Sequence, residues 1–122
     1  MPFSYRIDTE HGLAVITLEG LVEGQTIIEA LRAVTRDPAW LPTYDRLWDV
    51  REITRGDLDL KNQEAMVNEA KEHPAPRTAI VVRRDIDEAI ARAFKAYLRR
   101  SHPVEVFHSM EKALAWLGKS TA

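Results

Sequence analysis

Arginine, aspartate and threonine side chains follow two of the predicted strands and could together bind an anion. Asp49, Arg51 and Thr54 lie at the exit of the third predicted strand, and Arg83 and Arg84 follow the fourth. The carboxyl ends of parallel strands meet at one edge of a sheet, beside the N-termini of the next helices. We therefore expect these five residues to share a rim, where two or three guanidinium groups could hold a carboxylate or a phosphate.

A structural interpretation of these basic residues competes with the binding one, and we favour it. Asp49 and Asp85 would pair with the neighbouring arginines and cap helices. A second basic group lies on the third predicted helix, where Glu88 precedes Arg92 by four residues, as in an ordinary helical ion pair. We interpret that group as a solvated face. Its members are Arg92, Lys95, Arg99 and Arg100.

Other kinds of chemistry find little support in the sequence. The absence of cysteine excludes disulfides, thiolate metal sites and a cysteine nucleophile. The four histidines lack the i, i+4 spacing of a metal pair, and the serines lack the glycine pattern of a nucleophile elbow. There is no glycine-rich loop to cradle a phosphate. We therefore expect a protein that is not an enzyme and that uses no metal or cofactor.

Length and composition indicate one globular domain, residues 1–122. The chain is 45% hydrophobic and 30% charged, as ordinary globular domains are. Its formal net charge of -2 does not favour nucleic acid or an anionic membrane. No apolar stretch approaches the ~18 residues that span a bilayer, and residues 1–4 show no start of a signal peptide. We expect a cytoplasmic protein with no nucleic-acid partner and no membrane span.

The spacing of apolar residues predicts elements in the order β-β-α-β-α-β-α-β-α. A short turn at Gly12 joins the first two strands as an antiparallel hairpin, and the later alternation of strand and helix implies parallel strands. This is an α/β domain with a mixed five-stranded sheet, the first and fifth strands at its edges. The predicted strands are 3–8, 13–18, 46–50, 78–82 and 104–107, and the predicted helices are 23–36, 60–72, 85–99 and 110–117.

Local signals predict where several elements begin and end. Gly20 is expected to end the second strand, and the polar stretch 51–57 is expected to form a turn. Asp85 and Glu88 suggest a capping box, and Ser109 is expected to cap the last helix. The third helix is expected to bury Ile86, Ile90, Ala93, Phe94 and Tyr97.

Three short motifs resemble a known family. They are Tyr5-Arg6-Ile7-Asp8, Asp49-Val50-Arg51, and the C-terminal stretch 105–118 with its Ala113-Leu114-Ala115-Trp116-Leu117-Gly118. Together with the order of elements they resemble the STAS-like domains related to bacterial anti-sigma-factor antagonists. The chain is most similar to a subgroup of small stand-alone bacterial proteins of unassigned function, grouped by fold with CRAL-TRIO lipid-binding domains. The resemblance implies a superhelical α/β fold and regulation through protein–protein contact.

The sequence departs from this family at the phosphorylation switch. Switching antagonists carry a phosphorylatable serine, in an Asp-Ser-Ser-Gly-like run, after the third strand. The corresponding stretch 51–59 contains no serine, and Thr54 is its only hydroxyl. Asp57 or Asp59 is expected to serve there as a helix N-cap. We therefore expect no phospho-switch, or at most one at Thr54.

Two functions remain open. The first is a regulatory or protein-interaction module that forms a homodimer, because crossover helices would cover only one face of the sheet and leave the other to a second copy. The alternative is a carrier or sensor of a small apolar or amphipathic ligand, held between sheet and helices with its acidic end on Arg51, Arg83 or Arg84. The second helix has a thin apolar stripe and would move as a lid over that ligand.

Overall fold

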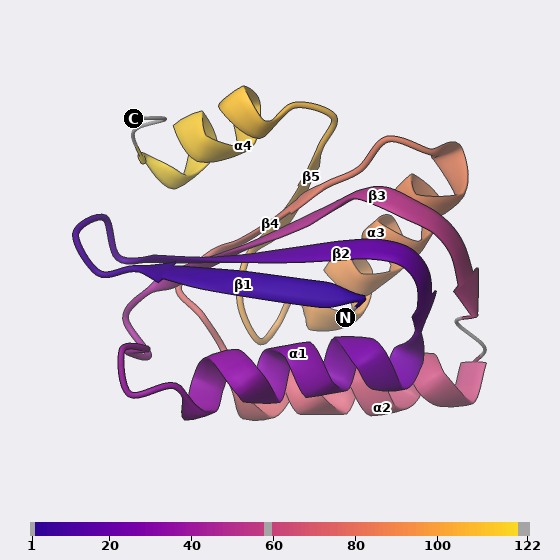
Figure 1. The fold of residues 1–122 in the computed structure, drawn as a ribbon, viewed down its shortest axis with the longest axis horizontal. Helices are drawn as coiled ribbons and strands as arrows, with labels where there is room; N and C mark the ends of the chain where they lie inside the picture. The colour runs from indigo at the N-terminus through magenta and orange to yellow at the C-terminus, as the bar shows by residue number, and fades with distance from the viewer. Residues whose placement is uncertain (1, 58–59, 120–122) are drawn as a thin grey trace.

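A mixed five-stranded sheet with helices on both faces forms the fold (Figure 1). The computed structural model describes residues 2–57 and 60–119. The strands follow one another in chain order across the sheet, with the first pair antiparallel and the rest parallel, so the predicted architecture is confirmed. The strands are β1 (Phe3–Asp8), β2 (Leu13–Glu23), β3 (Asp45–Asp57), β4 (Thr78–Val81) and β5 (Val104–Phe107), and the helices are α1 (Gly24–Arg36), α2 (Leu60–Glu72), α3 (Asp85–Leu98) and α4 (Met110–Leu117).

The two faces of the sheet carry separate apolar clusters, because successive side chains of a strand point to opposite faces. In β2, Ala14 and Ile16 belong to the cluster that includes Val34 of α1 and Ala91 of α3. The intervening Val15 belongs to the cluster that includes α4. β2 is therefore buried on both sides, which explains its nearly continuous apolar sequence.

Helix α4 covers the face that we expected a second chain to cover. Leu47 and Val81 are fully buried in the cluster that contains Leu114 and Leu117 of α4. Figure 1 shows α4 on the side of the sheet opposite α1 and α2. The expectation of a bare apolar face is wrong, because the helix that follows β5 folds back over it.

Strands β2 and β3 extend further than predicted. β2 continues past Gly20 to Glu23, and the stretch 51–57, predicted as a turn, forms the second half of β3. The pairing shifts register on both sides of Gly20, whose φ of 71° suits a bulge. β4 pairs with β3 only as far as Asp49, so among the described strands none lies beside this two-stranded extension, which therefore tolerates polar residues. The N-cap expected at Asp57 or Asp59 lies outside the described side chains.

Helix α3 begins with a different cap from the predicted one. Arg84 is the N-cap residue, Asp85 is the first helical residue, and the Glu88 N–H donates to the Arg84 carbonyl, so the capping box is wrong. Ile86 and Tyr97, expected inside, are 61% and 57% exposed. The buried face of the helix includes Asp87, which pairs with Arg84. The other fully buried residues of α3 are Ala91 and Leu98.

Contacts at both ends hold α4 in place. Ser109 caps the helix as predicted, accepting a hydrogen bond from the Lys112 N–H at 3.3 Å. At the other end, Arg77 donates to the carbonyl oxygens of Trp116 at 2.9 Å and Leu117 at 2.8 Å. These bonds satisfy carbonyl groups that a helix end leaves open. Several residues of the C-terminal family motif therefore serve the docking of this helix.

Candidate functional site

The rim predicted from the sequence lies at the edge of the sheet where β4 ends. Arg83 Nε donates to the carbonyl oxygen of Arg51 at 3.0 Å, and Arg84 Nη1 donates to the carbonyl oxygen of Thr54 at 2.7 Å. Asp49 lies beside the last residue of β4 in the register. The structure thus brings together all five predicted residues, hereafter the rim. Ligand binding there, and phosphorylation of Thr54, stay predictions.

Two of the three guanidinium groups on the rim already have carboxylate partners. Arg51 donates from Nε and Nη2 to the two oxygens of Asp49, each at 2.9 Å. Burial would raise the pKa of Asp49, but its hydrogen bonds with Arg51 outweigh burial and lower it. Arg84 pairs with Asp87 at 2.7 and 3.0 Å, where we expected Asp85. Within residues 2–57 and 60–119, the exposed Arg83 pairs with no carboxylate, so it presents the free charge of the rim.

The second basic group has acidic neighbours, as a solvated face does. Arg92 Nε lies 3.4 Å from Glu88, which also contacts His108, and Lys95 Nζ lies 2.6 Å from Glu105. These pairs lie at the surface and contribute little to stability. The other two members, Arg99 and Arg100, are exposed to solvent. This geometry agrees with our interpretation of the group as a solvated face of the helix.

An apolar cavity of about 110 Å³ lies between the sheet and helices α1, α2 and α3. Leu31, Met66 and Phe94 reach it from the three helices, and Trp48 and Ile80 reach it from the sheet. The alternative function required a cavity in this place. The three rim arginines do not line it, so the expected position of an acidic group within it is wrong.

Four buried polar side chains also line this cavity: Asp87, which pairs with Arg84, and the group Arg46, Thr78 and His102. Arg46 and Thr78 begin the paired segments of β3 and β4 and are register partners, so they lie side by side on one face of the sheet. His102 follows α3 and precedes β5. The exposed fractions of Arg46, Thr78 and His102 are 2%, 4% and 6%. We call these three residues the polar end of the cavity. They lie at the N-terminal end of the parallel strands, and the rim lies at the C-terminal end.

The guanidinium group of Arg46 is buried without a carboxylate partner among the described residues. In the part of the chain that the structure describes, no acceptor lies within hydrogen-bond distance of its Nε and Nη1, and the hydroxyl of Thr78 has no partner either. The ring of Trp40 lies 5.8 Å from Arg46 Cζ. Burial lowers the pKa of Arg46 to about 10, and burial together with the charge of Arg46 lowers the pKa of His102 to about 4. At pH 7 the polar end therefore carries one positive charge, on Arg46.

Comparison with known proteins bears on the fold. No protein-family model and no curated protein matches the chain. An uncharacterised protein of the DUF3478 family from Shewanella loihica PV-4, solved with a SpoIIAA-like fold, superposes with a TM-score of 0.64 at 15% identity, over 94% of this chain and 93% of that one. This chain has a SpoIIAA-like fold. An anti-sigma factor antagonist from Mycobacterium paratuberculosis superposes with a TM-score of 0.58 at 16% identity, over 96% and 95% of the two chains.

The SpoIIAA-like fold confirms the STAS-like architecture that the motifs implied. The grouping with CRAL-TRIO domains stays a prediction. Among the helices of the described residues, none combines the length and the apolar character needed to cross a membrane.

Arg46 is a residue of this SpoIIAA-like fold that could not be recognised from its position alone, because the first residue of a predicted strand carries no chemical signal. The alternation along β3 was the available signal. Arg46 lies two and four residues before Trp48 and Val50, so all three share a face. An arginine on the apolar face of a strand needs an anionic partner, because burying an unpaired charge is costly. This need distinguishes Arg46 from the exposed arginines.

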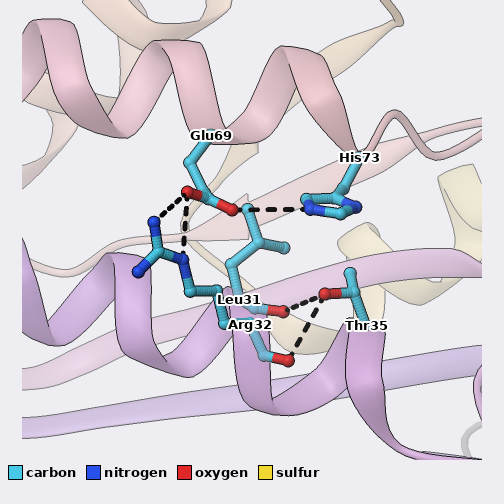
Figure 2. A network of polar contacts seen from close by, with 5 residues as sticks. All are labelled: Leu31, Arg32, Thr35, Glu69 and His73. Atoms are coloured by element: carbon cyan, nitrogen blue, oxygen red, sulfur yellow. Dashed lines mark hydrogen bonds and ion pairs between the residues drawn. The ribbon is translucent and has the colours of Figure 1, made fainter.

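A polar network joins α1 to α2 of the SpoIIAA-like fold (Figure 2). Glu69, whose side chain is 9% exposed, accepts hydrogen bonds from Arg32 Nε at 3.1 Å and Nη2 at 2.8 Å. Its other oxygen lies 3.4 Å from His73 Nε2. The hydrogen bonds from Arg32 lower the pKa of Glu69. Glu69 and His73, with Glu72, lie close enough to offer metal ligands, but Arg32 already neutralises Glu69.

Proposed function

We propose that this chain is a non-enzymatic regulatory module that acts by binding a partner protein at the rim. The SpoIIAA-like fold carries this proposal, because it spans more than nine-tenths of the chain and is shared with a protein named as an anti-sigma factor antagonist. The pairing of Arg51 with Asp49 and of Arg84 with Asp87 also favours a surface for recognition over a reactive centre.

Exposed apolar side chains beside the rim support the same proposal. Ile86 follows Arg84 by two residues and is 61% exposed. Leu21, 54% exposed, lies in the extension of β2 and pairs in register with Arg55, next to Thr54. Arginine beside exposed apolar groups is typical of protein interfaces. The rim and these two side chains form one candidate surface.

A charge reversal at Arg83 tests this surface. Affinity purification of the full chain from its source organism, followed by quantitative mass spectrometry, measures which proteins co-purify. We expect Arg83→Glu to lose a partner that wild type and Arg100→Glu both retain, because Arg100 is an exposed arginine away from the rim. A partner retained equally by both variants would contradict binding at the rim.

The expected homodimer stays a prediction, and α4 removes the physical reason given for it. The apolar residues of the face in question are buried within one chain. Sedimentation velocity at micromolar concentration decides the oligomeric state.

A second candidate function, the carriage or sensing of a small apolar or amphipathic ligand, is favoured by the cavity. A space of about 110 Å³ beside a buried, unpaired cation is unusual for a core that serves packing alone. Native mass spectrometry of the protein from its source organism would show a co-purifying small molecule if this function holds.

A further inference from the structure

The cation of Arg46 is buried, and no carboxylate of the described residues pairs with it. Charges inside proteins are paired, because an isolated one is expensive to remove from water. Arg46 is 2% exposed, and two of its nitrogens have no acceptor among residues 2–57 and 60–119. A water molecule could accept hydrogen bonds from these nitrogens, but it would leave the charge uncompensated. An anion would supply both the acceptor and the charge.

We propose that the cavity binds a small carboxylic acid with an apolar body, whose carboxylate accepts hydrogen bonds from Arg46 and Thr78. The body of the acid would occupy the part of the cavity lined by Leu31, Met66 and Phe94. This inference rests on the second candidate function, and it adds the chemical class of the ligand and the residues that select it.

The charge of the polar end favours a carboxylate over a phosphate. Arg46 supplies one positive charge, and His102 is neutral at pH 7. The carboxylate of Asp87, which also lines the cavity, is already paired with Arg84. A carboxylate carries one negative charge and matches Arg46, whereas a phosphate monoester carries about 1.5 to 2 and would remain partly uncompensated. The hydroxyl of Thr78, 4% exposed and without a partner, offers a neutral donor beside the cation.

The volume of the cavity limits the apolar body. A cavity of roughly 150 Å³ in another protein holds benzene. At about 110 Å³, this cavity suits a body on that scale, such as a short chain or one small ring. A membrane lipid with two acyl chains is far larger than this space. We therefore choose hexanoate as the probe.

Titration of the full chain with hexanoate and with hexan-1-ol, followed by ¹H–¹⁵N NMR, tests the proposal. The alcohol has the same six-carbon chain without the charge. For wild type we expect a Kd for hexanoate at least about tenfold lower than for hexan-1-ol, with shifts centred on the amides of Thr78 and His102. Arg46→Met should lose this preference, and Arg100→Met, which removes an exposed arginine, should keep it.

The outcomes separate this inference from the function beneath it. Equal affinity of wild type for the two compounds, with shifts around the cavity, would overturn the carboxylate site and leave ligand carriage standing. No shift around the cavity with either compound would overturn both. If Arg46→Met does not fold, Thr78→Val provides the second test, since losing the hydroxyl should weaken hexanoate binding several-fold and leave hexan-1-ol binding unchanged.

Discussion

Arg46 makes the folded chain less stable than an apolar residue would at the same place. Burial lowers its pKa to about 10, which corresponds to a cost of about 3 kcal/mol at neutral pH, where both the folded and the unfolded chain carry the charge. The penalty is relieved only as pH rises above about 10. A residue retained at such a cost without a partner suggests a role other than packing.

Arg46→Met should therefore stabilise the protein in the absence of ligand. We expect the free energy of unfolding to rise by about 1–3 kcal/mol, because a well-packed apolar side chain replaces a buried charge. Urea denaturation at pH 7 measures this change. A loss of stability of similar size would show that Arg46 serves the fold.

His102 should make stability depend on pH. Its pKa is about 4 in the folded chain and 6.5 when unperturbed, because burial and Arg46 both oppose its protonation. Between these values the unfolded chain binds more protons, so stability falls as pH is lowered from about 6.5 to 4, by about 3 kcal/mol. Urea denaturation over this range should show a shallower slope for His102→Gln than for wild type. Identical slopes would contradict the assignment.

At the scale of elements, α2 is held by few apolar contacts and one ion-pair network. Met66 and Val67 are its buried apolar residues among those whose side chains are described, and Glu69 binds Arg32 of α1. A helix held in this way is a candidate for local opening, and it forms one wall of the cavity.

Glu69→Gln should loosen α2 more than it loosens the sheet. Loss of the charge weakens both hydrogen bonds from Arg32, so amide exchange in α2 should accelerate relative to β4. Glu64→Gln, at an exposed position of the same helix outside this network, is the matched control and should exchange as wild type does. If α2 of wild type is as protected as β4, its role as a lid is wrong.

Apolar periodicity predicted the elements wherever one face or both faces of an element are buried. The run Ala79 to Val82 and the stripe Ile28, Leu31 and Val34 are of this kind. The second half of β3 was missed because its polar residues belong to a two-stranded extension without a third strand beside it. The burial of Ile86 and Tyr97 was wrongly predicted because the buried face of α3 includes the charged Asp87, paired with Arg84, and hydrophobicity alone does not indicate a buried aspartate.

At the scale of the whole molecule, the parallel strands connect two distinct regions. The rim lies at the C-terminal end of these strands, and the polar end of the cavity lies at their N-terminal end. The rim was predictable because strand ends and arginines can both be recognised in sequence. The polar end was not, because it depends on which side chains lack a partner, and that follows only from the packing of three helices on the sheet.

Asp87 links the rim to the cavity. It lines the cavity and pairs with Arg84, which in turn donates to the carbonyl oxygen of Thr54. In our proposal the ligand would occupy a cavity that Asp87 lines, and the partner protein would bind the rim that Asp87 contacts through Arg84.

A crystal structure of the chain grown with hexanoate tests the account most directly. We predict a carboxylate within hydrogen-bond distance of Arg46 and Thr78, with the six-carbon chain directed between the sheet and helices α1, α2 and α3. An Arg46 side chain turned to solvent, or paired with a carboxylate of the protein itself beside an empty cavity, would contradict it.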